Sequence, residues 1–423
     1  MRCSSTAISG SNMATSSLSD SMPGSRAEPA ARAARVRPRW WIVALVAPLL
    51  IFLIATFVLP VVMMLSRGVS DPELPQSWPR AAVALRQWDG AGLPSDALAR
   101  TVAGDIVAAR RAGTLNRVAN RLNYDRVGSR SLLYLTSARL AAGAKVGGLS
   151  DLAAIDPRWR DRAYWGAMRH AAGPSTSFYL LAALDRRIDA DGRLTKVPAD
   201  QAVFVDILLR TFKISAVVAL LCAALGYPVA YLLASLPDRK ANPLLILVLL
   251  PFWTSALVRT TAWVVLLQTN GVVNGLLEGI GLIDAPRQLL YNRVGVYIAM
   301  THVLLPFFIL PLYGVMKGIQ PSAMRAASSL GAPPLTAFAR VYLPQTLPGV
   351  MAGAIIVFTL ALGYYLTPAL VGGGADQMIS GSIAFYTNQS LNWGMAAALS
   401  LLLLLPLTLM LFAGRTLART VPA

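Results

Sequence analysis

The stretch RAASSLGAPPLTAFARVYLPQTLPG, residues 325–349, separates two long apolar runs, and neither side of its central glycine is long enough to cross a bilayer. Pro321 suits the first turn of a helix, and Gly331 suits the residue just past the end of that helix. We therefore expect a short helix that ends at Gly331, with a positive φ at this glycine.

A second short helix is predicted after Pro333 and Pro334 and should stop at Pro344. Apolar side chains recur between these points at helical spacing, at Leu335, Phe338 and Tyr342. Two interpretations of the helix pair remain open. Either it packs as an interfacial element on a helical bundle, or it presents an apolar face to a groove on a cytoplasmic partner.

The composition places the chain among membrane proteins. Of its 423 residues, 55% are hydrophobic and only 14% are charged, whereas soluble domains carry about 25% charged residues. The formal net charge of +18 is typical of basic cytoplasmic loops that meet anionic lipid. No nucleic-acid-binding module is recognisable, so the lipid bilayer is an expected partner and nucleic acid is not.

Apolar runs that can cross about 30 Å of hydrocarbon occur six times. The first, residues 40–65, is too long for a signal-peptide core and should be a retained transmembrane helix with Trp40 and Trp41 at the interface. The sequence thus predicts an all-α integral membrane protein with six transmembrane helices. The other five spans are expected at Ile214–Ser235, Pro243–Leu267, Gly295–Met316, Leu347–Val371 and Met395–Ala413.

Charge in the short loops predicts that both termini are cytoplasmic, because basic residues gather in the segments expected inside. Residues 1–39 are rich in Ser, Ala and Arg without apolar periodicity, and should form a disordered cytoplasmic tail. Residues 414–423 should form a second cytoplasmic tail. The basic residues expected inside, beyond the first tail, are Arg239, Lys240, Lys317, Arg325, Arg340, Arg415 and Arg419.

The long loop 66–206 is expected to be an external, mainly helical domain without a catalytic motif. Ser95 suits an N-cap and Gly113 suits a helix end. Similar helical patterns cover residues 131–142 and 177–185. Between Ser95 and Gly113, apolar residues keep helical spacing at Leu98, Val102, Ile106 and Ala109.

RAASSLG followed by FARVYLP resembles the coupling-loop signature of binding-protein-dependent ABC import permeases. LGYPVAYLLA (225–234), LPFWTSALVRTTAW (250–263) and LLPFFILPLYGVM (304–316) look like the spermidine/putrescine branch of that family, and the resemblance covers about residues 207–413. Arg325 stands where the family usually has glutamate, a charge reversal. The residues that match the signature are Ala326, Ala327, Gly331, Ala332, Val341, Leu343 and Pro344.

This resemblance implies a type I ABC-importer permease fold, with a five-helix core over residues 207–413 and a cytoplasmic coupling loop over residues 317–346. The matching residues, Arg325 and Phe338 would contact a dimer of ATP-binding subunits. A second permease subunit, in a homo- or heterodimer, and a periplasmic solute-binding protein are the other implied partners. The implied location is a bacterial inner membrane, and the implied solute is a polyamine or a related organic cation or amino-acid-like compound.

No G-x-x-x-x-G-K-[ST] loop or nucleophile elbow occurs, so we expect a non-enzymatic subunit without a cofactor, with ATP used by a partner. His170 and His302 lie far apart, and Cys3 and Cys222 suggest no disulfide framework, so no metal site is expected. The alternative functions are a secondary transporter and a membrane-anchored sensory or scaffold protein. A secondary transporter should show internal repeats and embedded carboxylates, and the sequence offers neither.

Arg259 is essentially the one ionisable residue within an expected span. It either snorkels or packs between helices, or it lines a gate or translocation path. Tyr227, in a Gly-Tyr-Pro sequence expected to bend the second span, and Tyr364 and Tyr365 in the fifth span either pack or line the same path. No buried acidic residue presents itself for a cationic solute.

Overall fold

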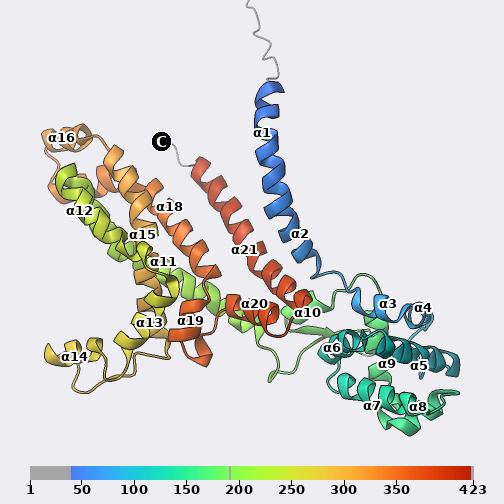
Figure 1. Cartoon of the computed structure of the whole chain (residues 1–423). Coiled ribbons are helices and arrows are strands. Elements are labelled where there is room, and N and C mark those ends of the chain that lie inside the picture. Colours follow the sequence, from blue (N-terminus) through green and yellow to red (C-terminus); the bar gives the residue numbers. More distant parts are fainter. Residues whose placement is uncertain (1–39, 190–191, 421–423) are drawn as a thin grey trace, which may run out of the picture. The chain divides into compact units, whose positions relative to one another are not determined.

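The computed structural model describes residues 40–189 and 192–420, so the expectations for the tail 1–39 and for Ala423 lie outside the described residues. The contacts divide the chain into two units between Thr56 and Phe57. Figure 1 shows the helices and strands of the described residues. Helix α1 covers Trp40–Leu53, a π-helical turn follows at Ile54–Val58, and α2 covers Leu59–Ser66. The first span is therefore helical throughout, as predicted.

Five helices in the described part of the chain are long and apolar enough to cross a membrane, and a bent helix pair completes a sixth span if it counts as one crossing. The bent pair joins α12 (Asp238–Leu249) and the 3-10 turn Leu250–Trp253 to α13 (Ala256–Leu267) at an angle of 96°. The all-α membrane fold is confirmed, but the third span is broken rather than straight. The five helices are Leu45–Ser66, Phe204–Ser235 (α11), Arg293–Gly318 (α15), Pro334–Gly363 and Trp393–Phe412 within α21 (Trp393–Thr420).

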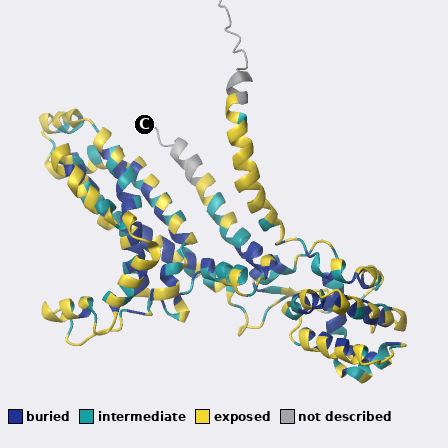
Figure 2. Ribbon diagram, in the orientation of Figure 1, coloured by how far each residue is buried: buried dark blue, intermediate teal, exposed yellow. Residues whose placement is uncertain are grey.

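The centre of the bundle depends on two glycines that contact Phe308 of α15. A Cβ on Gly226 of α11 would lie 2.7 Å from Cδ1 of Phe308, and a Cβ on Gly353 of α18 (Leu343–Gly363) would lie 2.9 Å from Cδ2. The Phe308 side chain is fully buried, and Figure 2 shows the buried residues of these helices in dark blue. Small residues allow helices to approach closely in lipid, where the hydrophobic effect does not hold them together. Helices α11, α15 and α18 therefore pack tightly on one another.

An ion pair lies at each end of α15, and each pair joins two loops that the sequence predicts to be on the same side of the membrane. At the end of α15, Lys317 Nζ lies 2.8 Å from Asp238 Oδ1, which joins two loops expected inside. At its start, Arg293 Nε lies 2.8 Å from Asp376 Oδ1, which joins two loops expected outside. The two sets of loops thus lie at opposite ends of the same membrane-spanning helix.

The fifth span differs from its expected bounds at both ends. The helix runs through Pro344, because the π-helical turn Phe338–Tyr342 precedes it and Leu343 N donates to Phe338 O, five residues back. Pro344 then lies in the first turn of α18, where its missing N–H costs little. The predicted stop at Pro344 is therefore wrong. So is the extension to Val371, since α18 ends at Gly363.

Shorter helices connect the spans. Residues 366–371, which were expected to continue the fifth span, form a separate helix. These elements are α14 (Val272–Gly279), α16 (Pro321–Ser329), α17 (Pro334–Ala337), α19 (Leu366–Val371), the 3-10 turn Gly374–Asp376 and α20 (Ile379–Asn388).

Residues 70–175, called the insertion below, form a helical domain with its own core. Ser95 Oγ accepts a hydrogen bond from Leu98 N at 3.3 Å and Gly113 has a φ of +70°, which confirms the predicted start and stop of α5. The elements are α3 (Glu73–Ser77), α4 (Pro79–Gln87), α5 (Asp96–Arg111), α6 (Leu115–Asp125), α7 (Ser129–Ala141), α8 (Leu149–Ile155), the 3-10 turn Pro157–Arg160 and α9 (Arg162–Ala171).

Large aromatic side chains fill the core of the insertion. Trp159 is fully buried, and its ring centroid lies 5.1 Å from that of Trp165. Its indole Nε1 donates to Thr136 Oγ1 at 2.9 Å, so the buried N–H has a partner. This core is therefore of the kind found in water-soluble domains.

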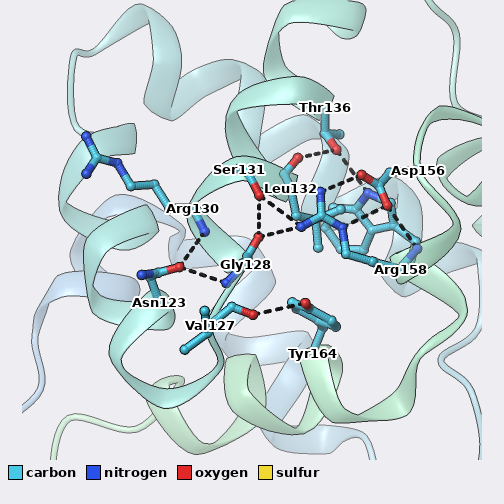
Figure 3. Close-up of polar contacts among 11 residues, drawn as sticks. Asn123, Val127, Gly128, Arg130, Ser131, Leu132, Thr136, Asp156, Arg158 and Tyr164 are labelled. Atoms are coloured by element: carbon cyan, nitrogen blue, oxygen red, sulfur yellow. Dashed lines mark hydrogen bonds and ion pairs between the residues drawn. The ribbon is translucent and has the colours of Figure 1, made fainter.

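Arg158 joins three segments of the insertion beside that core (Figure 3). Its guanidinium donates to Asp156 Oδ1 at 3.0 Å and Oδ2 at 2.7 Å, to Gly128 O at 2.9 Å and to Ser131 Oγ at 2.9 Å. The Asp156 carboxylate also accepts from the backbone N of Arg158 at 3.0 Å and so caps the 3-10 turn. The loop before α7 is thereby tied to the segment between α8 and α9.

The chain enters and leaves the insertion at one point. Ser70 and Ser175 form an antiparallel bridge, and Asp71 N donates to Pro174 O at 3.1 Å. Three short elements follow before α11, and the hairpin among them was not predicted from the sequence. They are α10 (Phe178–Ala183) and the strands β1 (Arg186–Ile188) and β2 (Leu194–Lys196).

Candidate functional site

The predicted hinge of the coupling loop is present at Gly331. Helix α16 ends at Ser329, and Gly331 N donates to Ser328 O at 3.0 Å while Ala332 N donates to Ala327 O at 3.1 Å. Gly331 has a φ of +81°, and a Cβ there would meet no atom within 4 Å. The glycine is therefore required by the left-handed backbone and not by packing.

Two leucines on either side of this hinge are almost fully exposed. Leu330 is 89% exposed and Leu335 is 83% exposed, and the charged Arg325 and Arg340 nearby are exposed as well. Sequence analysis did not single out Leu330, because it lies outside the helical pattern. Its place at a helix end, beside a glycine that turns the chain, is the signal that could have found it. The pair forms an apolar tip that no described part of the chain covers.

Phe338, by contrast, packs within its own chain. The half-buried ring lies 5.8 Å from the ring of Tyr231, 6.4 Å from that of Tyr227 and 5.6 Å from that of Tyr342, measured between centroids. Tyr227 also places its hydroxyl 3.2 Å from Thr346 Oγ1 of α18. Phe338 thus positions the coupling loop against α11, a contact that sequence analysis did not foresee.

The remaining loop residues that match the signature differ in exposure. Ala327, Ala332 and Val341 are half-buried, whereas Ala326 and Pro344 are exposed and Leu343 is 36% exposed. Helix α11 continues through Pro228 as one helix, so Tyr227 does not lie at a helix break. These residues support the shape of the loop, and their contact with a partner stays a prediction.

Arg259 bridges the break in the third span. Its Nη2 donates to Thr254 O at 2.8 Å and also to Pro251 O, and its Nε donates to Thr254 Oγ1 at 3.2 Å. Ser255 Oγ caps α13 by accepting from Val258 N at 3.1 Å. Irregular backbone at membrane depth needs such partners, because an unsatisfied carbonyl there costs several kcal/mol, of order 2–7. The geometry supports the packing interpretation of Arg259.

A second helix break, between the end of α18 at Gly363 and the start of α19 at Leu366, lies beside the first. Thr260 Oγ1 of α13 and Thr367 Oγ1 of α19 are 3.2 Å apart, so Arg259 and Tyr365 lie within two residues of the same contact. Tyr364 ends α18, and its carbonyl accepts from Ser380 Oγ at 2.8 Å, while Tyr365 is 47% exposed. Three of the four candidate path residues therefore flank the Thr260–Thr367 contact. Tyr227 does not.

A tryptophan–histidine pair, which sequence analysis missed, joins α13 to α15. Trp263 Nε1 of α13 donates to His302 Nδ1 of α15 at 3.2 Å, and the two rings are 5.3 Å apart. Spacing alone could have suggested Trp263, since it follows Arg259 by one helical turn. In the described residues no group of three or more His, Cys, Asp and Glu side chains is placed to hold a metal ion.

A helical membrane bundle with a broken span and a helix–glycine–helix loop exposed at one end is the architecture expected of a membrane transport subunit. The chain belongs to the family of binding-protein-dependent transport system inner membrane components, whose profile matches residues 224–421. It is an ABC importer permease subunit, a multi-pass protein of the cytoplasmic membrane. The insertion lies outside the matched residues.

Known proteins of this kind share about half of the chain. The spermidine/putrescine transport system permease protein PotB of Escherichia coli (strain K12) is 34% identical over 209 residues, which cover 49% of this chain and 76% of that protein. The inner membrane ABC transporter permease protein YdcU of the same organism is 34% identical, over 40% of this chain and 57% of YdcU. The molybdenum transport system permease protein ModB of Mycobacterium bovis (strain ATCC BAA-935 / AF2122/97) is 31% identical, over 46% and 73%.

Among solved structures, a bacterial ABC transporter involved in the import of the acidic polysaccharide alginate is similar over 52% of this chain and 80% of that chain. The TM-score is 0.42 and the sequence identity is 20%.

Proposed function

We propose that this chain forms one half of the channel of a polyamine importer, paired with a second permease subunit and driven by a cytoplasmic ATPase dimer. The observation that carries the proposal is the exposed apolar tip formed by Leu330 and Leu335 around Gly331. An exposed apolar tip flanked by arginines is typical of a surface that docks into a groove on another protein. No cofactor is assigned to this chain, since the partner would bind ATP.

The fold offers a direct mechanical connection from this tip to the channel. The helical segment that begins at Pro334, beside the tip, continues through the π-helical turn Phe338–Tyr342 to Gly363. A Cβ on Gly349 of this helix would lie 3.1 Å from Leu312 Cα, and Gly353 contacts Phe308, so the helix cannot slide without moving α15. Closure of the ATPase dimer would therefore tilt α18 and α15 together and switch the channel between outward and inward access.

The solute is inferred from the relatives, two of which differ in what they transport. PotB carries polyamines according to its name, and this chain is 34% identical to it, against 31% to the molybdenum permease. The exposed aromatic side chains near the helix breaks, Trp253 at 77% and Tyr365 at 47%, suit an organic cation through cation–π contacts. A periplasmic solute-binding protein would deliver the solute on the side of the insertion.

We propose the orientation that the ion pairs and the loop charges favour. The coupling loop and the loop at Asp238 would face the cytoplasm, the loop at Asp376 would face the periplasm, and both termini would be cytoplasmic. Cysteine labelling from the two sides of intact membranes tests it. Ser329→Cys should react only from inside and Asp284→Cys only from outside, and the reverse pattern would exclude docking of an ATPase on this loop.

The function is tested by purifying the chain with its cognate ATPase, permease partner and binding protein, and by measuring spermidine uptake into proteoliposomes. The variant Leu330→Ser/Leu335→Ser should still insert, but should lose co-purification of the ATPase by at least about tenfold, the usual effect of removing central interface contacts. Leu282→Ser is the matched control, because Leu282 is 68% exposed in the loop after α14, which we assign to the opposite side.

Substitutions of Gly331 test the turn separately from the contacts of Leu330 and Leu335. Gly331→Val should abolish coupled uptake, because a β-branched residue resists a positive φ, whereas Gly331→Asn should retain most uptake since asparagine tolerates that region. If all three loop variants bind the ATPase and transport spermidine normally, the loop is not the coupling surface. A different result would affect only the solute. If the loop variants lose coupling as expected, but ATP hydrolysis by the wild-type complex responds to another solute and not to spermidine, only the polyamine assignment is wrong.

A further inference from the structure

A cavity of about 750 Å³ lies where the insertion meets the start of α21, a size typical of small-molecule sites. The insertion and the end of α2 contribute charges of both signs to its wall, and Asn392 and Trp393 contribute from the segment at α21. The charged residues of the wall are Arg67, Arg117, Arg121, Asp71 and Glu73. A wall that carries both charges suits a ligand that carries both charges.

The centre of this wall is a buried ion pair. Arg121 Nε lies 2.6 Å from Asp71 Oδ2, and the two side chains are 2% and 0% exposed. Three of their polar atoms have no hydrogen-bond partner among the described residues: Asp71 Oδ1, Arg121 Nη1 and Arg121 Nη2. The guanidinium stacks on Phe178 and Tyr179, at 4.2 Å and 5.2 Å from the ring centroids.

Stacking does not replace the missing hydrogen bonds. A cation–π contact offsets part of the cost of burying a guanidinium, but donors left without acceptors in a buried site remain unfavourable. The two Nη atoms form a fork that matches a carboxylate, and the free Asp71 oxygen can accept from an ammonium group. Because Asp71 and Arg121 are bonded to each other, the two charges of a ligand that reaches both must be only a few bonds apart.

Three neighbouring residues, Asp125, Tyr179 and Gly394, surround the Arg121–Asp71 pair or the ring that packs on it. Asp125 also faces Arg121, and its Oδ2 has no hydrogen-bond partner among the described residues, but Asp125 does not line this cavity. Burial raises the pKa of the Tyr179 hydroxyl, so this group stays neutral beside the pair. A Cβ on Gly394 would lie 2.4 Å from the Tyr179 ring, so this ring lies directly on the backbone of α21.

We propose that this cavity binds a free α-amino acid with a polar side chain. Its carboxylate would accept from Arg121, its ammonium would donate to Asp71, and its side chain would lie toward Arg117 and Glu73. The Arg121–Asp71 pair belongs to the insertion, outside the family match, whereas Asn392 and Trp393 lie within the matched residues 224–421. The proposal does not depend on which solute the channel transports. It would report the concentration of an amino acid outside the membrane to the start of the last span.

The test measures ligand binding to the purified full-length chain in detergent, by calorimetry and by the shift of its thermal unfolding. The probes are L-glutamine, L-glutamate and L-arginine, with glutarate and putrescine as ligands that lack the ammonium or the carboxylate. At least one amino acid should bind with a Kd below about 1 mM, the range of specific small-ligand sites, and glutarate and putrescine should not.

Variants of the wall locate the binding. Arg117→Gln and Glu73→Gln should each weaken binding about tenfold with little change in the unliganded unfolding temperature, since neither side chain is buried. Arg121→Met should abolish binding if the variant folds. Arg80→Gln is the matched control, because Arg80 pairs with Asp105 in the same domain and its side chain is 70% exposed.

Three outcomes would overturn the proposal. One is the absence of binding by all three amino acids at about 10 mM, far above the Kd of a specific site. Another is equal binding of glutarate or of putrescine, which would make the cavity an anion site or a part of the cation path. The third is unchanged amino-acid binding in Arg117→Gln and Glu73→Gln, which would place the ligand elsewhere.

Discussion

The insertion and the membrane bundle are packed by opposite means. In the insertion, the fully buried Trp159 and Trp165 fill the interior, as expected where the hydrophobic effect in water rewards burial of large apolar area. In the bundle, Gly226 and Gly353 leave room for the single ring of Phe308. One chain thus contains two cores, one sensitive to lost volume and the other sensitive to added volume.

The buried Arg121 of the insertion and the half-buried Arg259 of the bundle differ in their hydrogen-bond partners. Arg121 of the insertion has a carboxylate partner in Asp71, whereas Arg259 of the bundle bonds only to backbone carbonyls and a threonine hydroxyl. A charge in a water-facing domain can be balanced by another charge. At membrane depth the break in the helix itself supplies the acceptors.

The largest effect is expected from removing volume in the insertion. Trp159→Ala should destabilise that domain by about 4 kcal/mol, because it leaves a large cavity and removes the indole donor from the Thr136 hydroxyl, which still donates to Leu132 O. Hydrogen exchange should show loss of protection in the insertion alone. Tyr134→Ala, at a side chain that is 41% exposed, is the control, and equal loss in both variants would contradict the assigned core.

Adding volume should be the more damaging change in the bundle. Gly353→Val should cost about 3 kcal/mol, because its side chain would overlap Phe308, and should lower the fraction of folded protein after heating in detergent. Gly314→Val is the matched control, since a Cβ on this helical glycine of α15 meets no atom within 4 Å. Comparable melting of the two variants would show that the glycine contacts do not hold the bundle together.

Removal of the bridge across the helix break should have an intermediate effect. Arg259→Met removes the guanidinium donor from the carbonyls of Pro251 and Thr254 and should cost about 2 kcal/mol. Pro251 O still accepts from Thr254 Oγ1 at 2.9 Å, so the loss falls mainly on the Thr254 carbonyl. Thr254→Cys in this background should react faster with a thiol reagent than in the wild-type background. Arg259→Lys should recover part of the loss, since it restores a donor, and no recovery would indicate a role other than hydrogen bonding.

The smallest effect should come from the Arg158 network and should depend on pH. Hydrogen bonds from Arg158 lower the pKa of the Asp156 carboxyl below its usual 3.8. A lowered pKa adds stability above the unfolded value, and this stability is lost as the pH falls through the folded value. Asp156→Asn should therefore cost about 1 kcal/mol at pH 7, and the difference from wild type should shrink below about pH 4.

The exposed pair Arg126–Asp161 in the same domain provides the comparison for that titration. Arg126→Gln should change stability by less than about 0.5 kcal/mol, because both side chains are more than two-fifths exposed. A pH-independent cost of Asp156→Asn would mean that the cap and not the charge stabilises the turn.

Length and hydropathy were sufficient to find the spans, and local capping signals were sufficient for α5 and for the turn at Gly331. The break between Leu250 and Ser255 could not be found in the same way, since the residues on both sides are equally apolar. Its signal is the combination of Pro251, a capping Ser255 and Arg259 one turn later, which has meaning only once the 96° bend is known.

The backbone of the loop around Gly331 could be predicted from the sequence, but the side chains that this loop exposes could not. Pro321 and Gly331 mark the ends of α16 directly in the sequence. Whether Phe338 or Leu330 faces a partner depends on Tyr227 and Tyr231, which lie more than a hundred residues earlier. Contacts of such sequence separation are fixed by tertiary packing, so helical periodicity alone could not show that Phe338 packs within its own chain.

The bridge between Ser70 and Ser175 has a consequence for how such a chain can arise. Because the insertion begins and ends at residues that lie side by side, its removal would leave two chain ends already next to each other. A hundred residues can therefore be gained or lost in one genetic event without altering the register of the helices around Phe308. Permeases that carry this domain and permeases that lack it can then share one channel architecture.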